Sequence, residues 1–308
     1  MICSASHPDH LSRSAARAPV PEPAYVSARG ARVLAALAGL SLVLAGCASG
    51  PSKPLLLSTT PADIAEVRPG SGILIGYLPR GELPDSLALL PPPPAEGSAA
   101  LAADQAAFQA TQSLRGSARW QMAARDNELQ FPRAADTFSC ALDLPIGETT
   151  TPHVNMLLRR TLADAGLSTY RAKDRYQRAR PFVRNQVATC VPHEEAKLAK
   201  DGSYPSGHSA LGWAWALILA ELSPERADRL LARGDAFGQS RMVCGVHWQS
   251  DVDAGRVMGS ATVARLHADP VFRAQMDAAR AEVAALRGRG LRPAGDCVAE
   301  AAALKAPR

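Results

Sequence analysis

Apolar residues recur at helical spacing through most of the chain from residue 98 onward, and strict alternation of apolar and polar residues is almost absent. One helix is predicted over residues 151–166. Thr151 is its expected N-cap, Pro152 occupies the first helical position and Gly166 is the expected stop. The pattern predicts an all-α fold.

Three further helices are expected from their boundaries. The first begins after Ser168 and runs to Arg180, because the residue before Pro181 is disfavoured in helical geometry. The second begins at the Ser-Pro-Glu of 223–225 and runs to Gly238 or beyond. A break at Gly245 then precedes a long helix over about 247–267.

The N-terminal region has the pattern of an export signal. Arg29 and Arg32 precede an apolar run over 33–46, which is shorter than the ~20 residues that span a bilayer. The run ends in LAGC, which resembles the lipobox of bacterial lipoproteins, so lipidation of Cys47 is favoured over simple cleavage and release. Residues 1–47 are therefore predicted to be a signal peptide with a lipobox-like end.

Segments rich in proline, serine and threonine divide the rest of the chain. Residues 48–71 are predicted to be a tether, and the Pro-rich stretch 90–100 to be a hinge that cannot be helical. Between them, residues 72–78 are expected to form a short strand or an extended docking segment. We expect a folded domain over 72–290 and a C-terminal tail over 291–308.

Charge and apolar content exclude two classes of function. The formal net charge is +5, and loss of the four basic and two acidic residues of 1–46 lowers it to +3. This excess is too small and too dispersed to indicate a nucleic-acid partner. The longest later apolar run, 210–220, is also too short to span a bilayer.

Four cysteines follow Cys47, namely Cys140, Cys190, Cys244 and Cys297. An even number in an exported chain predicts two disulfides, and three pairings are open. The spacings contain no C-x-x-C, so a zinc site is disfavoured.

Two segments carry groups suited to an anion. In KDRYQRARP (173–181), Lys173 and Arg180 are seven residues apart, so on one helix they would share a face. In GSYPSGHS (202–209), Ser206 and Gly207 open a helix, where backbone N–H groups without intrahelical partners would point at an anion.

A third segment, SRMVCGVHWQSD (240–251), combines a cation with a histidine and a carboxylate. His247 and Asp251 are four residues apart and therefore adjacent on one helix face. The break at Gly245 would bring Arg241 back toward them. Each feature alone is more often a solvated helix face, a packed histidine or a surface pair, and only the three segments together favour a site.

The three segments match the signature K-x6-RP, PSGH and SR-x5-H-x3-D of the type 2 phosphatidic acid phosphatase (PAP2) and vanadium haloperoxidase superfamily. The surrounding text, including RWQMAARD (119–126) and FSCAL (138–142), resembles the class A bacterial non-specific acid phosphatases over roughly residues 72–285. The resemblance implies a helical bundle that binds phosphate monoesters and hydrolyses them in the periplasm.

The resemblance also implies the role of each residue. His247 would attack phosphorus and form a phosphohistidine, Asp251 would fix its tautomer, and His208 would protonate the leaving group and later activate water. The phosphate oxygens would be held by Lys173, Arg180, Ser206, Gly207 and Arg241. Opposite protonation demands on the two histidines predict a bell-shaped pH profile with an acidic optimum.

No cofactor or metal is expected, and vanadate is expected to bind as a phosphate mimic. A magnesium pair at Asp251 and Asp253 is disfavoured, because on one helix the two carboxylates would lie on different faces. The expected partners are small phosphate monoesters such as nucleotides and sugar or aryl phosphates. Membrane contact is expected only through a lipid anchor, and the oligomeric state stays open.

Four alternatives are weighed against this interpretation. A serine hydrolase is disfavoured, since Ser206 lacks the G-x-S-x-G elbow after a strand. A membrane lipid phosphatase would need several membrane-spanning helices. A haloperoxidase would use the same anion site, and a non-catalytic anion-binding lipoprotein would need only the cations.

Overall fold

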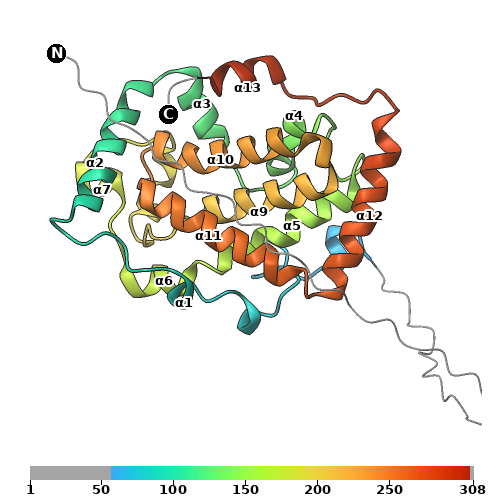
Figure 1. Ribbon diagram of the computed structural model, residues 1–308, viewed down its shortest axis with the longest axis horizontal. Helices are drawn as coiled ribbons and strands as arrows, with labels where there is room; N and C mark the ends of the chain where they lie inside the picture. Colours follow the sequence, from blue (N-terminus) through green and yellow to red (C-terminus); the bar gives the residue numbers. More distant parts are fainter. Residues whose placement is uncertain (1–56, 306–308) are drawn as a thin grey trace, which may run out of the picture. The chain divides into compact units, whose positions relative to one another are not determined.

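The computed structural model describes residues 57–305, and within this range the chain is helical (Figure 1). No strand occurs in these residues, and one isolated β-bridge joins Glu66 to Leu74. The all-α prediction is confirmed. The α-helices are α1 Ser86–Leu89, α2 Ala99–Thr111, α3 Ala118–Arg125, α4 Ser139–Leu142, α5 Pro152–Leu167, α6 Tyr170–Tyr176, α7 Pro181–Asn185, α8 Glu195–Leu198, α9 Gly207–Leu222, α10 Ala227–Val243, α11 Gln249–Leu266, α12 Pro270–Arg287 and α13 Cys297–Ala303. Short 3-10 helices occur at η1 Pro61–Asp63, η2 Arg80–Glu82, η3 Gln112–Leu114, η4 Arg133–Phe138, η5 Pro192–Glu194 and η6 Pro224–Arg226.

Helix α5 begins at Pro152 as predicted and ends at Leu167, one residue beyond the expected stop. Its N-terminus is capped differently from the expectation, because the Thr151 side chain makes no capping hydrogen bond. Glu282 of α12 instead accepts hydrogen bonds from the backbone N–H groups of His153 and Val154 at 3.1 and 3.0 Å. A carboxylate at this end also complements the helix dipole, so α12 is fixed to the start of α5.

The prediction that one helix carries both Lys173 and Arg180 is wrong. Helix α6 ends at Tyr176, because Gln177 adopts the left-handed conformation with φ of 43°. The loop that contains Gly202 packs against this end, where a Cβ on Gly202 would lie 2.8 Å from the Lys173 carbonyl oxygen. Arg180 lies beyond the break, in extended backbone before α7.

Helix α9 forms the centre of the bundle and is flanked by α10 and α11, with α5 also packed on it (Figure 1). It is apolar around nearly its whole circumference, which is the pattern of a buried helix. Its Trp215 is fully buried and donates from Nε1 to the Leu158 carbonyl of α5 at 3.0 Å. The long run 210–220 is therefore core.

Two glycines of α11 allow this helix to contact the backbone of α9 directly. A Cβ on Gly255 would lie 2.5 Å from the Ser206 carbonyl oxygen, and one on Gly259 would lie 2.4 Å from that of Ala210. Both distances are too short for a carbon and an oxygen that are not bonded. The closest approach of α9 and α11 therefore lies at the start of α9, beside PSGH.

Gly255→Ala is expected to lower the free energy of unfolding by about 1–3 kcal/mol, because the added methyl group meets backbone that cannot rotate away. Urea denaturation measures this change. Gly166→Ala in α5 is the matched control, since its Cβ meets no atom within 4 Å. The control is expected to be neutral or to stabilise by up to about 1 kcal/mol. Equal effects at the two positions would contradict the close approach.

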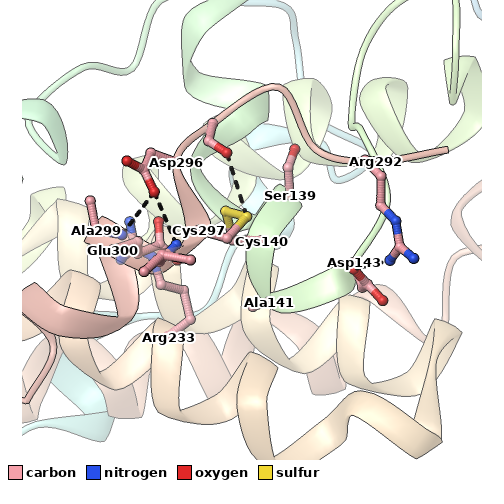
Figure 2. The surroundings of a disulfide bond; sticks show 12 residues. Ser139, Cys140, Ala141, Asp143, Arg233, Arg292, Asp296, Cys297, Ala299 and Glu300 are labelled. Carbon is pink, nitrogen blue, oxygen red and sulfur yellow. Dashed lines mark hydrogen bonds and ion pairs between the residues drawn. A yellow bond between two sulfur atoms is a disulfide. The ribbon is translucent and has the colours of Figure 1, made fainter.

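The four cysteines form two disulfides, Cys140–Cys297 and Cys190–Cys244. The prediction of two disulfides is confirmed, and one of its three pairings is selected. Figure 2 shows Cys140 of α4 joined to Cys297 of α13, with Glu300 and Arg233 close by. The segment 291–308, expected to be a tail, thus contains α13, which a disulfide joins to α4.

Residues 72–78 form an extended docking segment. The backbone N–H groups of Tyr77 and Leu78 donate to the buried Asp164 carboxylate of α5 at 2.9 and 3.0 Å. The predicted tether, residues 48–71, is described from residue 57, and this part includes η1 and the bridge at Glu66. The predicted signal peptide and Cys47 lie outside the described residues. Within 57–305, none of the helices has the length and apolar character needed to cross a membrane.

Candidate functional site

The segment after α10 turns back on itself, as the break at Gly245 predicts. Gly245 has φ of 82°, a conformation that favours glycine, and its N–H donates to the Met242 carbonyl at 2.8 Å. The N–H of His247 then donates to the Arg241 carbonyl at 3.2 Å. Arg241 and His247 are therefore close neighbours, although Arg241 belongs to α10 and His247 precedes α11.

His247 contacts Asp251, but not as two residues on one helix face. His247 precedes the N-cap Trp248, and Asp251 lies in the first turn of α11, where its Oδ2 accepts from the Trp248 N–H at 2.9 Å. The same oxygen lies 3.3 Å from His247 Nδ1. The contact follows from the geometry of the helix N-terminus.

The second nitrogen of the His247 ring faces a cation. Arg180 Nη1 lies 2.9 Å from His247 Nε2. Because a guanidinium can only donate, Nε2 is the acceptor, so the ring proton is assigned to Nδ1 on the Asp251 side. The lone pair of Nε2 points toward the cluster of basic side chains.

Lys173 and Arg180 come together through a shared carboxylate. Asp201 Oδ2 lies 3.3 Å from Lys173 Nζ and 2.9 Å from Arg180 Nη2. Both cations are almost fully buried, whereas the Asp201 side chain is 35% exposed. Lys173 also donates to the Gly202 carbonyl at 2.5 Å. Asp201, in the loop before PSGH, is thus the counter-ion of both cations in this structure.

Arg241 is fully buried and only partly bonded. Its Nη1 donates to Asn127 Oδ1 at 2.8 Å, but no described residue accepts a hydrogen bond from its Nε or Nη2. Burial and the neighbouring Arg180 lower the pKa of Arg241 to about 9, so the guanidinium stays charged at neutral pH. Burial and Arg180 likewise lower the pKa of Lys173 to about 8. Buried cationic donors without an acceptor fit an anion that supplies one.

Ser206 is the N-cap of α9, and its side-chain oxygen accepts from the Ser209 N–H at 3.2 Å. Its own N–H donates to the Asp251 carbonyl at 2.9 Å, so the expectation that this N–H is free was wrong. Within the described part of the chain, the N–H groups of Gly207 and His208 make no hydrogen bond. The free backbone donors therefore lie one residue further along than expected.

His208 is partly exposed, and its ring is held on two sides. Its Nε2 donates to the Asn127 carbonyl at 3.1 Å, and the ring stacks on Phe237 with centroids 6.2 Å apart. Desolvation and Arg241 lower the pKa of His208 well below its usual range. Desolvation and Arg180 do the same to the pKa of His247. In the free protein, both imidazoles are thus disfavoured as cations.

The residues predicted from the three segments are therefore neighbours, and together they can hold a small tetrahedral anion. Four contributors were missed by the sequence analysis: Asp104, Asn127, Arg178 and Asp201. Asp201 precedes PSGH, and Arg178 lies inside the K-x6-RP interval. Position inside or just before a motif is the only signal that the sequence offered for these two. Asp253 is exposed and pairs with Arg256, and no group of three or more His, Cys, Asp or Glu side chains suited to a metal occurs within 57–305.

Comparison of the sequence with known proteins identifies its family. The model of the PAP2 superfamily matches residues 155–274. A non-specific acid phosphatase of Providencia stuartii is 46% identical over 228 residues, which cover 72% of this chain and 92% of that protein. An acid phosphatase of Zymomonas mobilis is 43% identical over 65% of this chain and 75% of that protein. A non-specific acid phosphatase of Salmonella typhimurium is 43% identical over 63% of this chain and 78% of that protein.

Proposed function

Because the chain belongs to the PAP2 superfamily, among its class A non-specific acid phosphatases, we propose that it hydrolyses phosphate monoesters through a phosphohistidine at His247. The observation that carries this proposal is the pair of buried Arg241 donors without an acceptor, next to His247 and Arg180. A phosphate monoester brings a charge of about −1.5 to −2 and oxygens that accept such donors. Clamps of this kind stabilise the charge of a transferring phosphoryl group.

The first step uses the lone pair of His247 Nε2. Arg180 Nη1 transfers its hydrogen bond from Nε2 to a phosphate oxygen, which leaves Nε2 free. Nε2 then forms a bond to phosphorus while the bond from phosphorus to the ester oxygen breaks. His208 gives the departing oxygen a proton, and its Nδ1 is the nitrogen available for this, since Nε2 contacts Asn127.

The second step returns the free enzyme. His208, now neutral, takes a proton from a water molecule whose oxygen attacks phosphorus, and the bond from phosphorus to His247 Nε2 breaks. His208 is then protonated again, and once inorganic phosphate leaves it releases this proton to solvent, because desolvation and Arg241 depress the pKa of its ring in the free protein. Asp251 opposes the positive charge that the imidazole ring carries in the intermediate, through the contact with Nδ1.

His208→Asn is expected to lower kcat/KM for an alkyl phosphate by about 10²–10⁴-fold, because an alkoxide leaves poorly without a proton. With p-nitrophenyl phosphate the loss in kcat/KM should be much smaller, since p-nitrophenolate needs no proton to leave. Initial rates at substrate concentrations well below KM measure the difference and exclude the later attack of water, which is common to both substrates. Equal losses with both would contradict the role of His208 as a general acid.

The pH dependence follows from the same histidine. The pKa of His208 is depressed in the free protein, and a bound phosphate dianion favours the imidazolium. As pH rises through the pKa of His208 in the complex, the proton is lost and kcat falls. The activity optimum is therefore proposed to be acidic.

Hydrolysis of p-nitrophenyl phosphate by the purified protein, with and without EDTA, tests the function. We expect turnover in both conditions and an acid-labile, base-stable phosphoryl group on His247 after rapid quenching. An intact protein that binds phosphate without turnover would be an anion-binding protein, and vanadate-dependent halide oxidation without hydrolysis would indicate a haloperoxidase. Loss of activity in EDTA would contradict the metal-free mechanism.

Breadth of substrate and site of action are part of the proposal. The contacts described are all suited to the phosphate and select no leaving group, which supports action on nucleotides and on sugar or aryl phosphates. The two disulfides support an oxidising compartment, and we place the enzyme in the periplasm, with Cys47 as its proposed lipid anchor.

A further inference from the structure

A buried network of charges lies behind the proposed nucleophile and includes Arg178 and Asp104, which the sequence signature does not specify. Arg178, from the segment between α6 and α7, donates from Nη1 to Asp251 Oδ1 at 2.6 Å. Its Nη2 donates to Asp104 Oδ2 of α2 at 2.7 Å. The side chains of Arg178, Asp104 and Asp251 are at most 9% exposed. His247, Asp251, Arg178 and Asp104 therefore form a continuous chain.

Ser250 fixes Asp104 within this network. Its N–H donates to Asp104 Oδ1 at 2.9 Å, and its hydroxyl donates to Asp104 Oδ2 at 2.5 Å. Arg178 Nη1 also lies 2.8 Å from the Ser250 hydroxyl oxygen. Both oxygens of Asp104 are thus occupied, and α2 is tied to the start of α11.

Asp251 needs this support because it is fully buried. Desolvation raises the pKa of Asp251, and Arg178 is the strongest influence that lowers it again. The other charged or titratable groups that face Asp251 are Lys173, Arg180, Tyr204 and His247. Of these, His247 contacts the carboxylate, and it contacts the opposite oxygen from Arg178.

We propose that Arg178 and Asp104 are positioning residues for catalysis, which hold Asp251 ionised and aligned so that it orients the Nδ1–H of His247. The inference rests on the proposed function, in which His247 is the nucleophile. Neither residue touches the substrate. The positive charge of Arg178 stabilises the ionised carboxylate of Asp251. The negative charge of Asp104 partly neutralises Arg178 and so limits its effect on Asp251.

The two residues act in opposite electrostatic directions, which gives the inference a sharp test. Arg178→Met removes a positive charge beside the His247–Asp251 pair, so the pair binds a proton more readily. The acidic limb of the kcat/KM profile is expected to move to higher pH by about one unit or more. Asp104→Asn removes a negative charge and keeps an acceptor, so the same limb is expected to move to lower pH by a smaller amount.

A merely structural network would not produce shifts of opposite sign. Arg178→Lys retains the positive charge but not the bidentate guanidinium. It is expected to return the acidic limb of the kcat/KM profile part of the way to its wild-type position. It also keeps the test available if Arg178→Met does not fold. Arg184→Met, at the exposed Arg184–Glu96 pair, is the matched arginine control and should leave the profile unchanged.

A readout without turnover separates this inference from the proposed function. In the substrate-free protein, ¹⁵N NMR of labelled histidine, assigned with His247→Ala, follows the protonation of the His247 ring. Arg178→Met is expected to raise the pH at which this ring takes up a proton, and Asp104→Asn to lower it. Shifts of the same sign, or no shift in either variant, would overturn the inference even in an active enzyme. Opposite shifts in an inactive protein would support it while the proposed function failed.

Discussion

His247→Ala is expected to reduce kcat for p-nitrophenyl phosphate by about 10⁴-fold or more, because the variant lacks the only side chain proposed to attack phosphorus. Neither Asp251 nor Ser206 is placed to replace it. Asp251 lies on the Nδ1 side of the ring, away from the cations, and the Ser206 oxygen already accepts hydrogen bonds from Ser209. Steady-state rates with the purified variant measure the loss.

The matched control is His267→Ala. His267 is 41% exposed and pairs with Glu221 at 3.1 Å. Its removal should leave kcat and KM unchanged. Far-UV circular dichroism and inhibition of any residual activity by phosphate show whether the His247→Ala site remains formed. Wild-type turnover in His247→Ala would contradict the assigned nucleophile.

Arg233→Met is expected to lower the free energy of unfolding by about 3–5 kcal/mol, because it leaves a buried carboxylate without its counter-charge. Arg233 of α10 contacts Asp126 through both terminal nitrogens, at 2.6 and 3.2 Å, and each side chain is only 3% exposed. The Ser240 hydroxyl donates to the same carboxylate at 2.5 Å. Urea denaturation with both disulfides intact measures the loss.

A double variant tests the reason for that loss. Arg233→Met with Asp126→Leu removes both charges, so it should be more stable than Arg233→Met alone. The exposed pair formed by Arg280 and Asp277 provides the control, since Arg280→Met should cost no more than about 1 kcal/mol. An Arg233→Met protein as stable as the wild type would contradict a structural role for the buried pair.

Some helix boundaries could be predicted because single residues determine the local backbone. Pro152 begins α5, and Gly245 produces the reversal before α11. The end of α6 could not be predicted in this way. Gln177 adopts a left-handed conformation that suits glycine better, and a loop more than twenty residues later packs against the backbone of Lys173 and Gln177. That loop is a tertiary neighbour, which no local pattern reveals.

The candidate site likewise combines residues that the sequence identifies with residues that only tertiary contacts reveal. The signature identified Lys173, Arg241 and His247 as candidates, because the chemistry of an anion site depends on residue type, whereas the helix spacing inferred for Lys173 and Arg180 was wrong. Asp104 could not be identified from the sequence, since its place near the site depends on contacts with Ser250, which lies 146 residues away in the sequence. Ser206 was assigned a free backbone donor that the Asp251 carbonyl in fact occupies. Helix position alone does not reveal which donors a neighbouring element uses.

Asp201 changes how the entry of a substrate should be understood. In the free protein its carboxylate already contacts Lys173 and Arg180, so the two cations are paired with an anion before a phosphate ester binds. On the proposed function, binding is an exchange of one anion for another, and the measured affinity is the difference between two interactions. The same exchange runs in reverse after each turnover, when the returning carboxylate competes with inorganic phosphate and favours its departure. Asp201 would therefore lower the affinity for substrate and, for the same reason, limit inhibition by inorganic phosphate.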